Sequence, residues 1–299
     1  MDLRQVSSLL RQRFYPLLWL GLCFVAIAFL VRLALLIRTG AGVPDSPLYW
    51  LYAFGVGLFY DIVTFIYVAW PLVLYLWLMP RRAYVSRVHQ WLFYALGLAF
   101  VYALLFVAAA EWIFWGEFGT RFNFIAVDYL IYTTEVIGNI RQSYPIGPWL
   151  SMLALAAVLI MLYTRRALRV RDEGSRFRDR SLVVAIWLAM TGLSVATVRA
   201  DMKDRFENTY VNALAGNGIY QLFAAFRSNR LDYRRFYRTL PDARAFSIVR
   251  GLLQTPDATY LSNDPQDITR AIRNPGPEQH LNVVLISVES LSGEYLAHF

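Results

Sequence analysis

Five long apolar segments constrain the fold of this chain more than any other feature. A helix crosses the hydrocarbon core of a bilayer with about 17–25 mostly apolar residues, and each segment reaches that length. The second is longer than a bilayer needs, which predicts a tilted helix or one that begins in the membrane interface. The sequence therefore predicts an all-α polytopic membrane domain with transmembrane helices over Phe14–Ile37, Leu48–Met79, Gln90–Trp115, Pro148–Thr164 and Ser181–Val198.

The first apolar segment, Phe14–Ile37, is predicted to be retained as a helix. It is longer than the core of a signal peptide, and no small-residue cleavage site follows it. The composition agrees with a membrane protein, because 58% of the residues are hydrophobic, well above the share in ordinary soluble domains. The single cysteine, Cys23, lies inside this segment, so the chain cannot form an intrachain disulfide.

The arginines predict the orientation. They gather in short clusters before the first span, over Arg81–Arg87 and over Arg165–Arg180, and five spans put all three clusters on one side. The positive-inside rule makes that side cytoplasmic, so everything after Val198 is predicted to face outward. The net charge of +8 follows this topological pattern. No nucleic-acid partner is predicted, because such a surface interleaves basic residues with stacking aromatic residues.

Residues 116–147 form the predicted outer loop between the third and fourth spans. Aromatic residues such as Phe122, Phe124 and Tyr129 are interleaved with the charged residues Arg121 and Asp128. This mixture suits helices that lie in the outer interface of the membrane with their aromatic side chains in lipid. An ordinary packed loop explains the same residues equally well.

Asp61 and Arg32 are candidate site residues inside the membrane. Asp61 falls near the middle of the second span, where a carboxylate costs on the order of 3 kcal/mol on insertion scales, and Arg32 in the first span is its candidate partner. Gly55 and Gly57 permit close approach of helices there. The pair is expected either to hold the bundle together or to support a lipid-access groove. Glu111, at the outer end of the third span, is interpreted as a charge at head-group level.

Residues 199–281 are predicted to form a juxtamembrane linker of short helices, with an amphipathic segment over Asn212–Phe226. The short β-branched run Asn282–Val288 then predicts a buried parallel strand that ends at Glu289. In open α/β sheets the chemistry gathers at the carboxyl ends of the strands. A hard carboxylate in that position suits a divalent cation, and a structural strand with a solvated end fits the same residues.

The end of the chain also carries a family resemblance. Its segment Asn282–Gly293 (NVVLISVESLSG) resembles the opening of the extracellular domain of the lipoteichoic acid synthase family, membrane-anchored phosphoglycerol transferases of the sulfatase and alkaline-phosphatase superfamily. Two further segments, Arg121–Leu130 (RFNFIAVDYL) and Ser143–Pro145 (SYP), resemble Gram-negative members of this family. The implied location is therefore the bacterial cytoplasmic (inner) membrane, with a cytoplasmic N-terminus and an extracytoplasmic C-terminal part.

The resemblance implies a division into three parts. Residues 1–198 are the expected five-helix transmembrane domain and residues 199–281 the helical linker. Residues 282–299 are the expected start of an extracytoplasmic sulfatase-like catalytic domain, of the α/β alkaline-phosphatase type and truncated in this chain.

The implied activity is the transfer of a phosphoglycerol-type or phosphoethanolamine head group. The donor would be a phospholipid of the phosphatidylglycerol type, and the acceptor a glycan or a lipid. In the family, the glutamate at the position of Glu289 is a ligand of a divalent metal, with manganese expected and magnesium or zinc as alternatives. The nucleophilic threonine and the other ligands would lie beyond Phe299, so these 299 residues alone are expected to be inactive.

A function from a different class fits the same sequence. The chain would then be a non-catalytic membrane module that binds lipid or acts as an adaptor for a partner protein. Lipid binding without metal or turnover would distinguish this module from a transferase. Neither function fixes the oligomeric state.

Overall fold

The computed structural model describes residues 13–131, 133–166, 168–169, 175–228, 239–277 and 280–288. The chain divides into two compact units, Met1–Arg230 and Leu231–Phe299, each of which is described by itself. The first unit holds all of the long helices. The boundary between the units thus lies about 30 residues beyond the end of the predicted transmembrane domain, because the segment after the fifth span packs back onto the bundle.

Five helices in the described residues are long and apolar enough to cross a membrane, as predicted. Their ends lie within a few residues of the predicted ends, except in the second span. These candidate spans are Tyr15–Gly42, Pro47–Val68, Arg87–Phe118, Ile146–Thr164 and Phe177–Thr197.

The second predicted span is divided into two helices, which corrects its predicted extent. Helix α3 covers Pro47–Val68 and α4 covers Trp70–Leu78, with a break at Ala69. Pro71 follows the break at the second position of α4. Proline has no N–H group, so it is tolerated in the first turn of a helix and disfavoured inside one. Leu48–Met79 is therefore a broken helix and not one tilted span.

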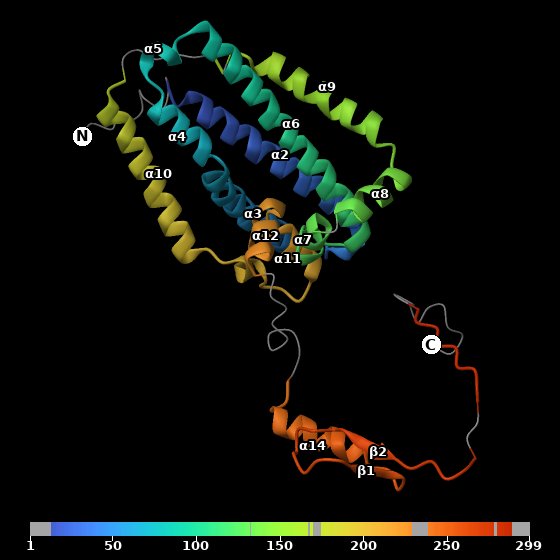
Figure 1. The fold of residues 1–299 in the computed structure, drawn as a ribbon. Coiled ribbons are helices and arrows are strands. Elements are labelled where there is room, and N and C mark those ends of the chain that lie inside the picture. Colours follow the sequence, from blue (N-terminus) through green and yellow to red (C-terminus); the bar gives the residue numbers. More distant parts are fainter. Residues whose placement is uncertain are drawn as a thin grey trace. The chain divides into compact units, whose positions relative to one another are not determined.

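The bundle is built around α2 (Tyr15–Thr39). This helix contacts α3 and α6 (Arg87–Phe118), and α9 (Ile146–Thr164) packs on the far side of α6. The last span, α10 (Phe177–Thr197), contacts α3 and α4 (Figure 1). Hydrogen bonds from indole N–H groups fix α10, because Trp70 donates to Thr191 over 3.0 Å and Trp77 to Ser181 over 2.9 Å.

The arginine-bearing segments meet at one end of this bundle. Arg13, just before α2, donates from Nε to the carbonyl of Leu76 over 2.7 Å. Arg180 of α10 donates from Nη1 to the carbonyl of Met79 over 3.0 Å. Both cations thereby satisfy carbonyls at the C-terminal end of α4, where a helix leaves such groups unpaired and the helix dipole favours positive charge. This clustering is the arrangement that the positive-inside prediction requires.

The predicted orientation can be tested by cysteine labelling. In a Cys23→Ala background, we expect a membrane-impermeant maleimide to label Glu207→Cys in intact spheroplasts. Val85→Cys should be labelled only after the membrane is permeabilised. Val85 and Glu207 are both exposed, so accessibility across the membrane decides the result. Labelling of Val85→Cys in intact spheroplasts, with Glu207→Cys protected, would contradict the orientation.

The predicted outer loop contains two short helices, α7 (Phe124–Ile131) and α8 (Thr133–Ser143). Val127 faces inward and is fully buried, whereas Phe124 and Leu130 are exposed. Exposed apolar side chains on short helices suit a membrane interface.

The segment after α10 returns to the bundle. It forms a 3-10 turn, η2 (Ala200–Lys203), and two helices, α11 (Thr209–Leu214) and α12 (Gly218–Arg227). Helix α11 contacts α2 and α3, and α12 contacts α3 and α7 (Figure 1). This stretch, predicted as part of the linker, is thus an integral part of the first unit.

The described residues of the second unit form one helix and a pair of short antiparallel strands. Helix α14 (Asp242–Leu253) is followed by β1 (Ala258–Tyr260) and β2 (Arg270–Ile272), which pair antiparallel with Thr259 opposite Ala271. The Arg250 guanidinium links the two parts, because it donates to the carbonyl of Asp264 over 2.7 Å and lies 4.0 Å from the centre of the Tyr260 ring.

The strand predicted over Asn282–Val288 is not formed in the described residues. Residues 281–288 belong to no helix or strand, and their apolar side chains are exposed, with Leu285 at 90%. A strand needs a neighbour to satisfy its backbone groups, and β1 and β2, the only described strands, pair with each other. Glu289 lies outside the described residues.

Candidate functional site

The structure brings together Arg32 and Asp61, the two intramembrane residues singled out from the sequence. Arg32 of α2 donates to Asp61 of α3 through two parallel hydrogen bonds of 2.9 and 3.0 Å. Both side chains are almost completely buried. The planar guanidinium matches a carboxylate in this two-pronged geometry, which makes the pair both strong and directional.

The ion pair also holds the turn between α11 and α12. Arg32 donates from Nε to the carbonyl of Leu214 over 2.9 Å and from Nη2 to the carbonyl of Gly216 over 3.1 Å. Asn217 donates to Asp61 Oδ1 over 2.8 Å, while its own oxygen accepts from the backbone N–H of Tyr220. Asn217 therefore caps the N-terminus of α12 and also donates a hydrogen bond to the buried Asp61 carboxylate. The pair thus fixes the point where the chain returns to the bundle.

A second buried pair, Arg121 and Glu111, lies beside the first. Arg121 Nε is 3.3 Å from Glu111 Oε1, and Arg121 Nη1 donates to the Gly216 carbonyl over 3.1 Å. That carbonyl is shared with Arg32, so the two pairs form one network of buried groups. Only 5% of Glu111 is exposed, which corrects its interpretation as a charge at head-group level. The correction arises because Arg121 and the first turn of α12, at Gly218, pack against the Glu111 carboxylate.

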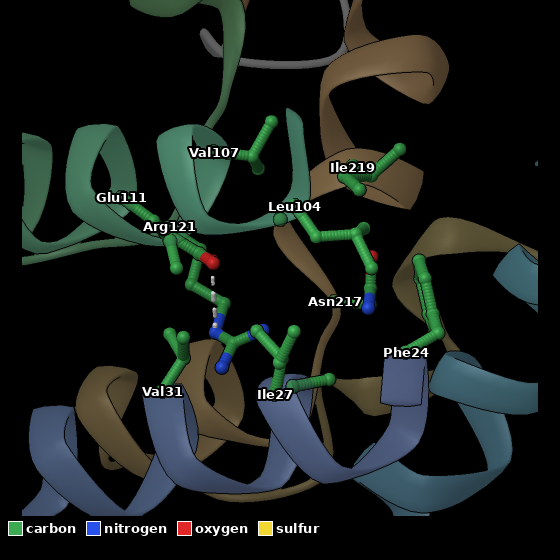
Figure 2. Close-up of a pocket in the computed structure, with 12 residues that line it drawn as sticks. Phe24, Ile27, Val31, Leu104, Val107, Glu111, Arg121, Asn217 and Ile219 are labelled. Carbon is green, nitrogen blue, oxygen red and sulfur yellow. Dashed lines mark ion pairs between the residues drawn. The ribbon is translucent and has the colours of Figure 1, made fainter. Parts of the chain in front are cut away.

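A small cavity of about 30 Å³ opens next to this second pair. Figure 2 shows Glu111, Arg121 and Asn217 around it, facing apolar side chains of α2 and α6. The described residues that line it are Phe24, Ile27, Ala28, Val31, Leu104, Val107, Ala108, Glu111, Arg121, Asn217, Gly218 and Ile219. The cavity thus combines a polar wall with an apolar one.

The packing of α12 against Glu111 depends on Gly218. A Cβ atom at this position would collide with the Glu111 carboxylate, so glycine lets the first turn of α12 approach it closely. The N-terminus of a helix carries a partial positive charge and favours a nearby carboxylate.

Aromatic side chains fix α12 from the other side. Tyr220 donates to the carbonyl of Val198 over 3.1 Å, and the Tyr60 hydroxyl donates to the carbonyl of Arg199. The two rings pack edge to face at 5.1 Å. Burial raises the pKa of Tyr220 above its usual value, so its hydroxyl stays protonated as a hydrogen-bond donor. These contacts make the position of Asn217 and Gly218 rigid.

The carboxylate expected to bind a metal is not among the described residues that form this network. Glu289 lies outside the described residues, and among the described ones no group of three or more His, Cys, Asp or Glu side chains could hold a metal ion. The described network pairs each carboxylate with a guanidinium, which leaves no cluster of carboxylates for a divalent cation.

No protein-family model, curated protein or solved structure matches this chain.

Proposed function

We propose that this chain is the membrane anchor and the beginning of a transferase. The enzyme would move a phosphoglycerol-type head group from a phospholipid to a glycan or lipid acceptor on the outer face of the bacterial inner membrane. One observation carries the proposal: the apolar run Asn282–Val288 leads directly into Glu289, in a segment that resembles the start of the lipoteichoic acid synthase catalytic domain.

The membrane part supports this proposal because an anchor of this kind would keep a catalytic domain close to a lipid substrate. The five candidate spans would hold a downstream catalytic domain next to its lipid donor, which raises the effective concentration of that donor. If the arginine-rich end of the bundle is cytoplasmic, as the positive-inside rule favours, an odd number of spans would put the segment after Thr197 on the outer side.

Glu289 would be one ligand of a divalent metal, most simply manganese, with magnesium or zinc as alternatives. Such a metal lowers the pKa of a hydroxyl nucleophile and neutralises charge on the phosphoryl oxygens. The nucleophile is expected beyond Phe299, as in the family.

A second function rests on the buried network itself. A non-catalytic module that binds lipid or serves as an adaptor needs only the first unit, where Glu111 and Arg121 face a cavity beside apolar helices. This module would bind phospholipid without metal and without turnover.

The complete reading frame separates the two functions. For the transferase we expect the frame to continue beyond the codon for Phe299, with a threonine some dozens of residues on and an Asp-His pair further along. A stop codon directly after Phe299 would contradict the transferase and leave the lipid-binding module.

A further inference from the structure

The cavity beside Glu111 and Arg121 presents unmet donors and an unmet acceptor to the same small space. Glu111 Oε1, Arg121 Nε and Arg121 Nη2 are buried and have no hydrogen-bond partner in the described part of the chain. Nε and Oε1 attract each other as an ion pair at 3.3 Å without a hydrogen bond between them. Buried polar atoms are normally hydrogen-bonded, so these three atoms point to a group that completes the site.

The chemistry of the two side chains limits what that group can be. A carboxylate only accepts hydrogen bonds, and a guanidinium only donates them. An anion would be repelled by Glu111, and an ammonium group would be repelled by Arg121. A neutral hydroxyl does both, because it donates its proton to Glu111 Oε1 while its oxygen accepts from Arg121 Nη2.

The size and the walls of the cavity limit the group further. The space beside these atoms is small, about 30 Å³, which suits a hydroxyl group better than a phosphate or a sugar ring. Apart from Asn217 and Gly218, the remaining lining is apolar and includes Phe24 and Val31 of α2 and Leu104 of α6 (Figure 2). A polar end surrounded by apolar walls fits an amphiphile better than a soluble polyol.

We propose that this cavity recognises a head-group hydroxyl of a membrane lipid, of the kind that glycerol carries and ethanolamine lacks. Glu111 accepts from the hydroxyl, Arg121 donates to it, and the lipid chains lie along the apolar side chains of α2 and α6. This assignment rests on the proposed function, since it names the residues that would select a glycerol head group, but the binding itself requires no catalysis.

Lipid binding by the 299-residue chain in detergent micelles tests the assignment. Native mass spectrometry would compare phosphatidylglycerol with phosphatidic acid, which has the charge but no head-group hydroxyl, and with phosphatidylethanolamine. We expect phosphatidylglycerol to bind about tenfold more tightly than either, the effect of one hydrogen bond to a charged group. Glu111→Leu, which has no acceptor for the hydroxyl, should remove this preference.

A second variant changes the site without removing a charge, and thermal unfolding of both variants in the same micelles checks that they remain folded. Gly218→Ala keeps both charges and improves helix propensity, and its Cβ atom intrudes on the Glu111 carboxylate, so it should also abolish the preference. Gly192→Ala, where a Cβ atom meets nothing within 4 Å, is the matched control that should keep it. Equal binding of the three lipids, or a preference that survives in both variants, would overturn the assignment and leave a resident water in the cavity.

The lipid-binding site and the proposed transferase can be refuted independently of each other. If the 299-residue chain prefers phosphatidylglycerol while protein made from the complete reading frame transfers no head group, the proposed enzyme is refuted and this site is supported. Transfer by a protein without the preference would do the reverse.

Discussion

Replacement of Asp61 by alanine is expected to lower the free energy of unfolding of the membrane unit by about 3–5 kcal/mol. The variant leaves Arg32 buried without its carboxylate, and an uncompensated buried charge is far more costly than the loss of one contact. Asn217 also loses its acceptor. Thermal unfolding in micelles, followed by tryptophan fluorescence, measures the change.

A double variant separates the charge from the packing. Asp61→Leu with Arg32→Met removes both charges, and we expect it to recover at least about half of the loss. The Leu214 carbonyl then lacks its side-chain donor and the Gly216 carbonyl keeps only Arg121, which is why recovery should be incomplete. A loss below about 1 kcal/mol for Asp61→Ala, as for an exposed ion pair, would contradict a structural role of this pair.

The proposed lipid-access groove has a milder test in Asp61→Asn. This variant keeps the shape of the side chain and removes its charge. Unchanged expression together with unchanged phospholipid binding would show that Asp61 does not support such a groove.

The second large effect is expected at Gly57. A Cβ atom there would collide with the Arg32 guanidinium, which lies against buried backbone carbonyls and has no room to withdraw. Forcing extra atoms into a packed interior costs about 1–3 kcal/mol, and the displaced guanidinium would also weaken its bonds to Asp61. We therefore expect Gly57→Ala to lower the midpoint of thermal unfolding and to release α12 from the bundle.

Gly55→Ala is the matched control. Gly55 lies on the same helix, two residues away, and a Cβ atom there meets nothing within 4 Å. Alanine in a helix interior is more favourable than glycine by up to about 1 kcal/mol, so this variant should be neutral or slightly stabilising. Equal destabilisation by the two substitutions would show that helix packing in general, and not the Arg32 guanidinium, sets the requirement at Gly57.

The five spans could be predicted because length and apolarity alone decide them. The break at Ala69 was missed, although Pro71 was its visible signal. The pairing of Arg32 with Asp61 followed from the cost of single charges in a membrane, which favours a partner on a neighbouring helix.

The remainder of the network could not be predicted from local patterns. Glu111 and Arg121 lie close together in the sequence, at the end of α6 and in the loop after it, whereas Asn217 joins the network only because α11 and α12 fold back onto the bundle. Asn217 lies inside the segment predicted to be amphipathic, Asn212–Phe226, and that pattern shows neither that it caps α12 nor that its side chain contacts Asp61. The segment Asn282–Val288 has strong strand propensity, but it forms no strand in the described residues because no neighbouring strand pairs with it.

Release of diacylglycerol tests the proposed transferase most directly. Protein made from the complete reading frame would be placed in vesicles that contain phosphatidylglycerol with labelled acyl chains. We predict release of labelled diacylglycerol with manganese, loss of that release with a chelator, and loss again in Glu289→Ala. A folded protein that retains phosphatidylglycerol and releases no diacylglycerol with any divalent metal would contradict the transferase and favour a lipid-binding module.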